Sequence, residues 1–132
     1  CYTIGNEVKT MSLFAELTRC RQWIEAALEH SGGTHTFDDI VGAVYAGQMQ
    51  FWPAESACAV TEIVTFPRRK VLHIFLAGGN MQEIVDMDGP AADFAKANGC
   101  TAMTIAGRRG WKKILEHKGY SEQFTTLSKE LL

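Results

Sequence analysis

The segment from Val71 to Leu76 constrains the fold more than any other part of the 132-residue chain. Apart from His73 it is a continuous apolar run with the length of one strand. Strands of this kind are covered on both faces in folded proteins. Because Ala77-Gly78-Gly79-Asn80 and a helical pattern follow directly, the sequence predicts layers of helices packed around a strand at this position.

Helical patterns precede this strand. From Ser12, a good N-cap residue, apolar residues recur in steps of three and four as far as His30, which predicts an amphipathic helix over residues 12–30. Thr36 with Asp39 three residues later has the pattern of a capping box and opens a shorter helix, which Gly47 ends. We therefore expect two helices joined by a short connection.

Strand patterns come next. Met49 to Trp52 is a short strand candidate ended by Pro53, and residues 57–66 are rich in β-branched residues. A turn at residues 67–69 leaves little chain between this second strand and the apolar run at 71–76. The two strands are therefore expected to form an antiparallel hairpin.

The rest of the chain alternates between helix and strand. Asn80 and Glu83 open a helical stretch that Gly89-Pro90 interrupts, which predicts a kink or two helices meeting at Asp88. A strand over 101–106 follows and should run parallel to 71–76 after a right-handed crossover. A short helix at 111–117 and a last strand at 123–127 complete one α+β domain with a mixed sheet over residues 1–132.

Composition excludes several classes of protein. Lys and Arg number 13 against 15 Asp and Glu, a net charge of −2, so we expect no nucleic-acid partner. No apolar run approaches the roughly 20 residues of a membrane span, and no signal peptide is visible, so neither a membrane protein nor secretion is predicted. The four cysteines and four histidines lack metal-ligand spacing, which predicts structural thiols, a reducing compartment and no metal.

The glycine turn after the apolar strand is a candidate anion site. Gly78 and Gly79 stand between a strand and a helix start, where unpaired backbone N–H groups and the helix dipole suit a phosphate. The segment is neither a Walker loop nor a dinucleotide fingerprint. The alternative is an ordinary strand-to-helix turn.

Glu62 and His73 are the candidate catalytic residues. Glu62 lies among apolar neighbours, where burial could raise its pKa into the range of a general base. His73 interrupts the apolar strand. The alternatives are a solvent-facing Glu62 and a His73 that belongs to the core or to a sheet edge. The basic clusters at 68–70 and 108–113 either bind phosphates or form solvated turns.

The order of these elements resembles the GNAT acyl-CoA acyltransferase superfamily. Two helices, a hairpin that ends in a glycine turn, a crossover helix and a strand follow one another, and Ile114 to Tyr120 looks like that family's Phe-Tyr-Glu-Lys-Leu-Gly-Phe segment. The resemblance covers about residues 10–130. It implies a GNAT-like mixed β-sheet flanked by helices.

The resemblance also implies a site for acetyl-CoA or CoA. In that family the strand before the glycine turn holds pantetheine through its main chain, and the turn holds the pyrophosphate. The residues at these positions, with the two arginines that could bind CoA phosphates, are Ile74, Phe75, Leu76, Gly78, Gly79, Asn80, Arg108 and Arg109.

Departures from the family pattern shape the functional prediction. Only adjacent glycines remain of the family's Arg/Gln-x-x-Gly-x-Gly/Ala signature, and Leu115 stands where a tyrosine often protonates the leaving thiolate. We therefore predict a degenerate acyl-CoA site in a non-catalytic binding or structural component. An active acetyl-CoA-dependent N-acyltransferase and an unrelated small α/β domain are the alternatives.

The compact form of the chain, with Gly107-Arg108-Arg109-Gly110-Trp111 before the last helix, is most similar to small GNAT-like proteins of tailed bacteriophages. This similarity implies a phage-encoded, virion-associated protein that is located in the virion or the host cytoplasm. It also implies other phage structural proteins as partners.

Overall fold

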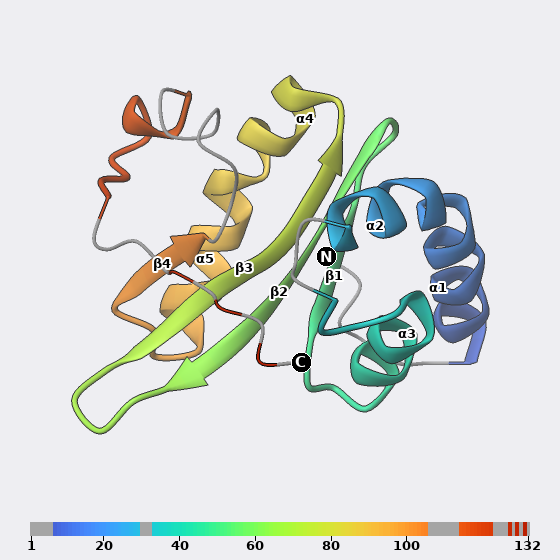
Figure 1. The fold of residues 1–132 in the computed structure, drawn as a ribbon, viewed down its shortest axis with the longest axis horizontal. Coiled ribbons are helices and arrows are strands. Elements are labelled where there is room, and N and C mark those ends of the chain that lie inside the picture. The colour runs from blue at the N-terminus through green and yellow to red at the C-terminus, as the bar shows by residue number, and fades with distance from the viewer. Residues whose placement is uncertain are drawn as a thin grey trace.

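A computed structural model describes residues 7–29, 33–105, 114–122, 127, 129 and 131 of the chain. The helices of these residues are α1 (Glu7–Arg19), α2 (Arg21–Leu28), α3 (Phe37–Tyr45), α4 (Met81–Asp86) and α5 (Asp88–Ala97). The strands are β1 (Gln50–Pro53), β2 (Ala57–Thr65), β3 (Lys70–Gly79) and β4 (Ala102–Ile105). Figure 1 shows the long β2–β3 hairpin crossing the molecule between two groups of helices.

The strands form one mixed sheet in the order β1-β2-β3-β4. β1 pairs with β2 and β2 with β3 in antiparallel fashion, whereas β3 and β4 are parallel. The antiparallel hairpin and the parallel pair are both as the sequence predicts. The structure is the expected single-domain α+β fold with a mixed sheet flanked by helices.

Each face of the sheet has its own apolar cluster. Helices α1, α2 and α3 cover one face, where the largest buried side chains include Leu17, Ile24, Ile40 and Phe51. Helix α5 covers the other face, where Ala91 and Ala95 pack with Trp52 and Leu72. β3 contributes to both clusters through Leu76 and Leu72, so the prediction of a strand covered on both faces is confirmed.

A bulge in β3 lies at Phe75. Val60 of β2 is opposite Leu76, but the next residue, Thr61, is opposite Ile74, so Phe75 is the extra residue. Side chains alternate between faces along a regular strand. Because of the bulge, Phe75 and Leu76 both pack against the cluster under α1–α3.

Several predicted boundaries are corrected. The helix expected over 12–30 is two helices that meet at Cys20, which is fully buried and whose N–H bonds to the carbonyl of Glu16. β3 continues to Gly79 because Ala57 and Cys58 still pair with it. β1 includes Pro53, which is tolerated because β1 lies at an edge of the described sheet.

The second helical stretch is two helices, α4 and α5, with Asp88 as the first residue of α5, one of the two predicted outcomes. Pro90 lies in the first turn of α5, where its missing N–H costs no helical hydrogen bond. Most of the expected helix at 111–117 and of the last strand at 123–127 lies outside the described residues.

Among the described residues, no helix combines the length and the apolar character that crossing a membrane requires.

Two glycines provide a matched test of the fold. Gly79 has a φ of +104°, and a Cβ there would lie 2.3 Å from the carbonyl oxygen of Ser56, whereas a Cβ on Gly42 meets nothing within 4 Å. We expect Gly79→Ala to destabilise the protein by more than about 1 kcal/mol, and Gly42→Ala, in the middle of α3, to stabilise it by roughly 0.5–1 kcal/mol. Urea unfolding measures both changes, and equal stabilities would contradict the tight contact at Gly79.

Candidate functional site

Three polar side chains lie in a row across the sheet. Glu62 of β2 is the register partner of His73 of β3, which is in turn the partner of Thr104 of β4. Glu62 is two residues beyond Val60, which packs under α1–α3, so the row lies on that face. The structure therefore brings together the two residues that the sequence predicts as catalytic, and it adds Thr104.

His73 has a hydrogen-bonded, partly buried ring. Its Nδ1 lies 2.8 Å from Oγ1 of Thr104. Burial lowers the pKa of His73 below its ordinary value, and the negative charge of Glu62 opposes this shift. The ring is therefore neutral at neutral pH and able to accept a proton.

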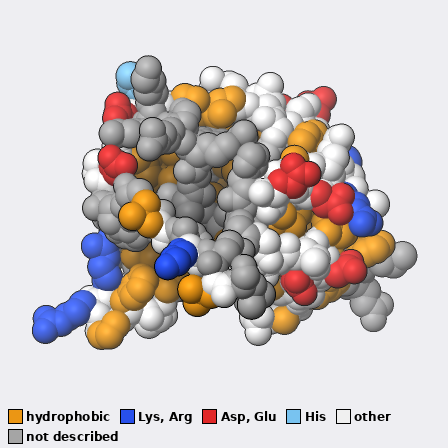
Figure 2. All heavy atoms as spheres, viewed as in Figure 1, with side chains coloured by type: hydrophobic (Ala, Val, Ile, Leu, Met, Phe, Trp, Pro, Cys, Tyr) orange, Lys and Arg blue, Asp and Glu red, His pale blue; other side chains and the backbone are white. Residues whose placement is uncertain are grey.

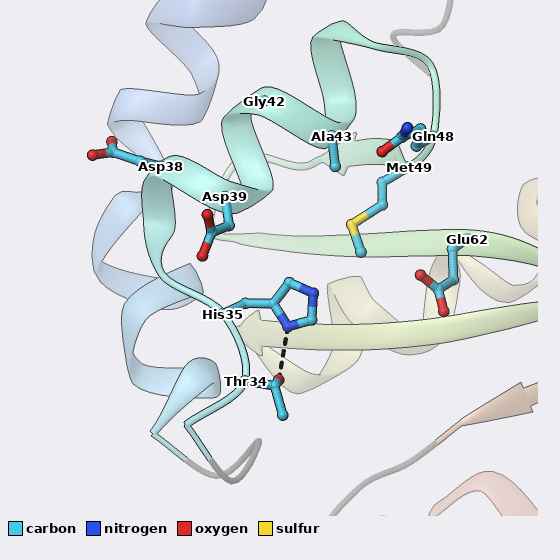
Figure 3. A pocket seen from close by; sticks show the side chains of 9 residues that line it. All are labelled: Thr34, His35, Asp38, Asp39, Gly42, Ala43, Gln48, Met49 and Glu62. Carbon is cyan, nitrogen blue, oxygen red and sulfur yellow. Dashed lines mark hydrogen bonds between the residues drawn. The ribbon is translucent and has the colours of Figure 1, made fainter.

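The side chain of Glu62 lines a pocket between β2, α3 and the segment before α3. The pocket has a volume of about 630 Å³, within the range of small-molecule sites. Figure 3 shows Glu62 and His35 on opposite sides of it, with Met49 between them. The remaining lining residues are Thr34, Asp38, Asp39, Gly42, Ala43 and Gln48.

Sequence reasoning missed His35. Its ring packs edge-on against Phe75, the bulge residue, with centroids 4.7 Å apart, and its Nδ1 is 2.7 Å from Oγ1 of Thr34. The only signal in the sequence was its place directly before the capping box of α3. The contact with Phe75 depends on the bulge, and the bulge arises only from the way β2 pairs with β3.

The two aspartates at the start of α3 differ in role. Thr36 and Asp39 form the capping box that the sequence predicts. The backbone N–H of Thr36 donates to the carboxylate of Asp39 at 2.9 Å and lowers its pKa. Asp38 is exposed at the pocket. Together with Glu62 they give the pocket a negative charge that would attract a cationic group.

The predicted pantetheine strand lies beside the end of β4. Pairing runs from Val71 and Ala102 to Ile74 and Ile105, where described β4 ends, and β3 continues to Gly79. Along this extension β3 still pairs with β2. Among the described residues, the other edge of Phe75 to Ala77 has no strand partner.

The glycine turn is packed more closely than the sequence suggests. A Cβ on Gly78 would lie 2.8 Å from the carbonyl oxygen of Trp23, so α2 lies directly against this residue. The N–H of Asn80 donates to Ser56 at 2.7 Å, and the Asn80 side chain accepts from the N–H of Glu83. Within the described residues, the N–H groups of Met81 and Gln82 remain to bind an anion.

Basic residues are distributed unequally around the glycine turn at Gly78 and Gly79. Arg68 and Arg69 lie in the exposed β2–β3 turn, at the opposite end of β3 from Gly79. Ten strand residues separate the two ends by roughly 30 Å. Figure 2 shows basic side chains where this turn projects. Arg68 and Arg69 are therefore solvated turn residues, which is one of the two alternatives that the sequence left open. Arg108 and Arg109 lie outside the described residues.

Two further side chains bear on acid catalysis. Leu115 is buried and has no proton to donate. The hydroxyl of Tyr120 donates to Asp88 at 2.9 Å, and burial together with that hydrogen bond raises the pKa of Tyr120. Neither residue is suited to protonate a leaving thiolate near neutral pH.

The three cysteines in the described part of the chain are buried, as expected of structural thiols. Cys20, Cys58 and Cys100 are buried free thiols. Hydrogen bonding to Cys20 and burial raise the pKa of Cys58, so its thiol stays protonated and unreactive. Over 7–29, 33–105 and the shorter described segments, no three His, Cys, Asp or Glu side chains gather as a metal site.

Comparison with solved structures identifies the fold as that of the GNAT acetyltransferases. A probable acetyltransferase matches over 89% of this chain and 93% of its own, at 10% identity and a TM-score of 0.66. A GNAT family acetyltransferase from Staphylococcus aureus matches over 96% and 95%, at 11% identity and a TM-score of 0.57. The aminoglycoside N-acetyltransferase AAC(6')-Iy, in complex with CoA, matches over 87% and 91%, at 9% identity and a TM-score of 0.55.

These identities show a shared fold and nothing finer. Two other acetyltransferases, from Arabidopsis thaliana and Trypanosoma brucei, match this chain over only 57% and 59% of their own length. No protein-family model matches the sequence, and no curated protein matches it either.

The electrostatics of His73 lead to a pH prediction. Because burial lowers its pKa in the folded state, the neutral ring contributes stability that is present above the unfolded pKa and lost as the pH falls through the folded value. We expect Glu62→Gln to lower the pKa of His73 further, since the carboxylate raises it. An NMR titration of the His73 ring in the unaltered protein and in Glu62→Gln measures its pKa in each.

Asp93→Asn is the control, because Asp93 is exposed on α5, which covers the other face of the sheet. It should leave the titration of His73 unchanged. A His73 pKa above the ordinary value in the unaltered protein, or one that rises in Glu62→Gln, would contradict this account of the site.

Proposed function

We propose that the chain is an acyl-CoA-dependent N-acyltransferase whose acceptor amine binds in the pocket lined by Glu62 and His35. The observation that carries the proposal is the position of Glu62. Its carboxylate opens into a pocket of suitable size and is the strand neighbour of a neutral imidazole. An ammonium group must lose a proton before its nitrogen can attack an acyl group, and this pair supplies a base.

The acyl donor in this proposal is acetyl-CoA, bound along the extension of β3. Backbone groups of Ile74, Phe75 and Leu76 would hold pantetheine, since β3 continues past described β4. The N–H groups of Met81 and Gln82 at the start of α4 would hold the pyrophosphate, because the N–H of Asn80 is already bonded to Ser56 and α2 lies against Gly78. When bound, acetyl-CoA supplies the acyl group as an activated thioester.

Charge balance at the pyrophosphate site is part of the proposal. Glu83 and Asp86 lie on α4 itself and would oppose an anion at its start. The carboxylate of Glu83 accepts from the N–H of Ser56 at 2.8 Å, which places this charge beside the turn. We therefore assign the compensating cations to Arg108 and Arg109.

The acceptor in this proposal is a primary amine in its ammonium form. Asp38, Asp39 and Glu62 would attract it. Glu62 and His73 would then take its proton, and the bulge at Phe75 would place His35 and the acyl group on the same side of the sheet. The protein's contribution is thus orientation and proton transfer.

A second candidate function is a non-catalytic GNAT-like component. The observation that favours it is the pair Leu115 and Tyr120, because the first has no proton to donate and the second is bonded to Asp88. In this case the acyl-CoA site is degenerate. The chain would then be a binding or structural part of a bacteriophage particle, in the virion or the host cytoplasm, with other phage structural proteins as partners.

Cofactor binding is tested by thermal unfolding with CoA and with acetyl-CoA. At a ligand concentration about 100-fold above Kd, binding stabilises a protein by roughly 2.7 kcal/mol, which is a rise of several degrees in Tm for a domain of this size. We expect that rise with either compound and none with adenosine. No shift at millimolar CoA would contradict both the cofactor site and the acyltransferase proposal.

Catalysis is tested with Glu62→Gln in an assay of acetyl transfer to a panel of primary amines. We expect kcat/KM to fall about 100-fold or more, because a general base typically contributes that factor, while the Tm shift with CoA is retained. Asp93→Asn should keep full activity. CoA binding without acetyl transfer to any amine by the unaltered protein would favour the non-catalytic function.

A further inference from the structure

We propose that Thr104 is a positioning residue that holds the ring of His73 so that His73 and Glu62 together accept the proton of the acceptor amine. This inference rests on the proposed acyltransferase function and deepens it by assigning a role to a residue that touches neither substrate. Its basis is the row of Glu62, His73 and Thr104 across three neighbouring strands.

The register places the imidazole between its two partners. Opposite residues on neighbouring strands have Cβ atoms about 5 Å apart and share one face of the sheet. Met103, next to Thr104, packs on the other face against the α5 cluster, so Thr104 lies on the face of Glu62 and His73. The ring of His73 is therefore bounded by a carboxylate on β2 and a hydroxyl on β4.

The hydrogen bond to Thr104 suits a ring that carries its proton on Nδ1. Oγ1 of Thr104 lies 2.8 Å from Nδ1 of His73, and a hydroxyl can accept from a protonated Nδ1 or donate to a bare one; in the tautomer that the proposal requires, Nδ1 donates to Thr104 and Nε2 takes up the proton. A neutral ring that accepts at Nε2 carries its existing proton on Nδ1. The Thr104 oxygen can accept that proton's hydrogen bond.

The same hydrogen bond favours the protonated ring. Hydrogen bonds from a charged donor are roughly twice as strong as neutral ones, so Thr104 stabilises the imidazolium more than the imidazole. Burial acts in the opposite direction, and among the described residues Glu62 is the charged group that raises the proton affinity of the ring. Thr104 and Glu62 thus offset the cost of charging a partly buried ring.

The proton step balances without a further reactant. The N–H bond of the ammonium breaks, its electron pair stays on the nitrogen as the attacking lone pair, and the proton is bound by the Glu62–His73 pair. That lone pair would form the C–N bond as the C–S bond of the thioester breaks; CoA would leave as the thiolate, and the second proton lost from the nitrogen would go to solvent or to that thiolate. The pair returns to its starting state by releasing that proton to solvent through the pocket that Glu62 lines.

The first test is the NMR titration of His73 in Thr104→Val and Thr104→Ser. Valine has nearly the shape of threonine without the hydroxyl, so the pKa of His73 should fall; serine restores the hydroxyl and should return the pKa to that of the unaltered protein. Thr104→Ala replaces the valine variant if the latter does not fold. An unchanged pKa in the hydroxyl-free variant would overturn the proposal.

The second test is the pH profile of kcat/KM. Thr104→Val should move the acid limb to lower pH and reduce the plateau about 3- to 10-fold, since a weaker base transfers the proton less efficiently, and Thr104→Ser should restore both. A lower plateau with an unmoved acid limb would indicate a merely structural role and overturn the proposal. If the unaltered protein transfers no acetyl group, the acyltransferase function fails, and the NMR titration alone decides whether Thr104 positions His73.

Discussion

The structure depends on the pairing of β2 with β3, a long antiparallel hairpin interrupted by one bulge. This pairing gives the sheet two buried faces, one under α1–α3 and one under α5. The extra residue at Phe75 shifts the side-chain alternation at the point where β3 passes the end of described β4. The part of β3 after Phe75 lies against α2 and α4. The part before Phe75 contains His73, the middle residue of the row formed by Glu62, His73 and Thr104.

The candidate site combines burial with two kinds of polar support. A histidine in a sheet is costly to charge, and burial accordingly lowers the pKa of His73. The carboxylate of Glu62 and the hydroxyl of Thr104 flank the ring, so the cost is partly offset. A neutral base next to an acidic pocket suits a cationic acceptor, and this is why we place acyl transfer before the non-catalytic role that the sequence favoured.

Local sequence patterns predicted much of the fold. The capping box at Thr36, the N-cap at Asn80 and the antiparallel hairpin are all present, because each depends on residues close together in the chain. Boundaries were less accurate. The helix expected over 12–30 is divided at Cys20, where the backbone has φ −87° and ψ 0°, and β3 extends to Gly79 because Ala57 continues to pair with it.

The sequence by itself determined the α+β class, the order of the elements, and Glu62 and His73 as residues whose chemistry stands out on apolar strands. Only the tertiary structure decided that these two are neighbours, that Thr104 completes the row, and that His35, which packs against Phe75, lines the pocket beside Glu62. The physical reason is that strand register and a bulge arise from pairing between distant segments. Local sequence patterns do not show which residues become neighbours when distant strands pair.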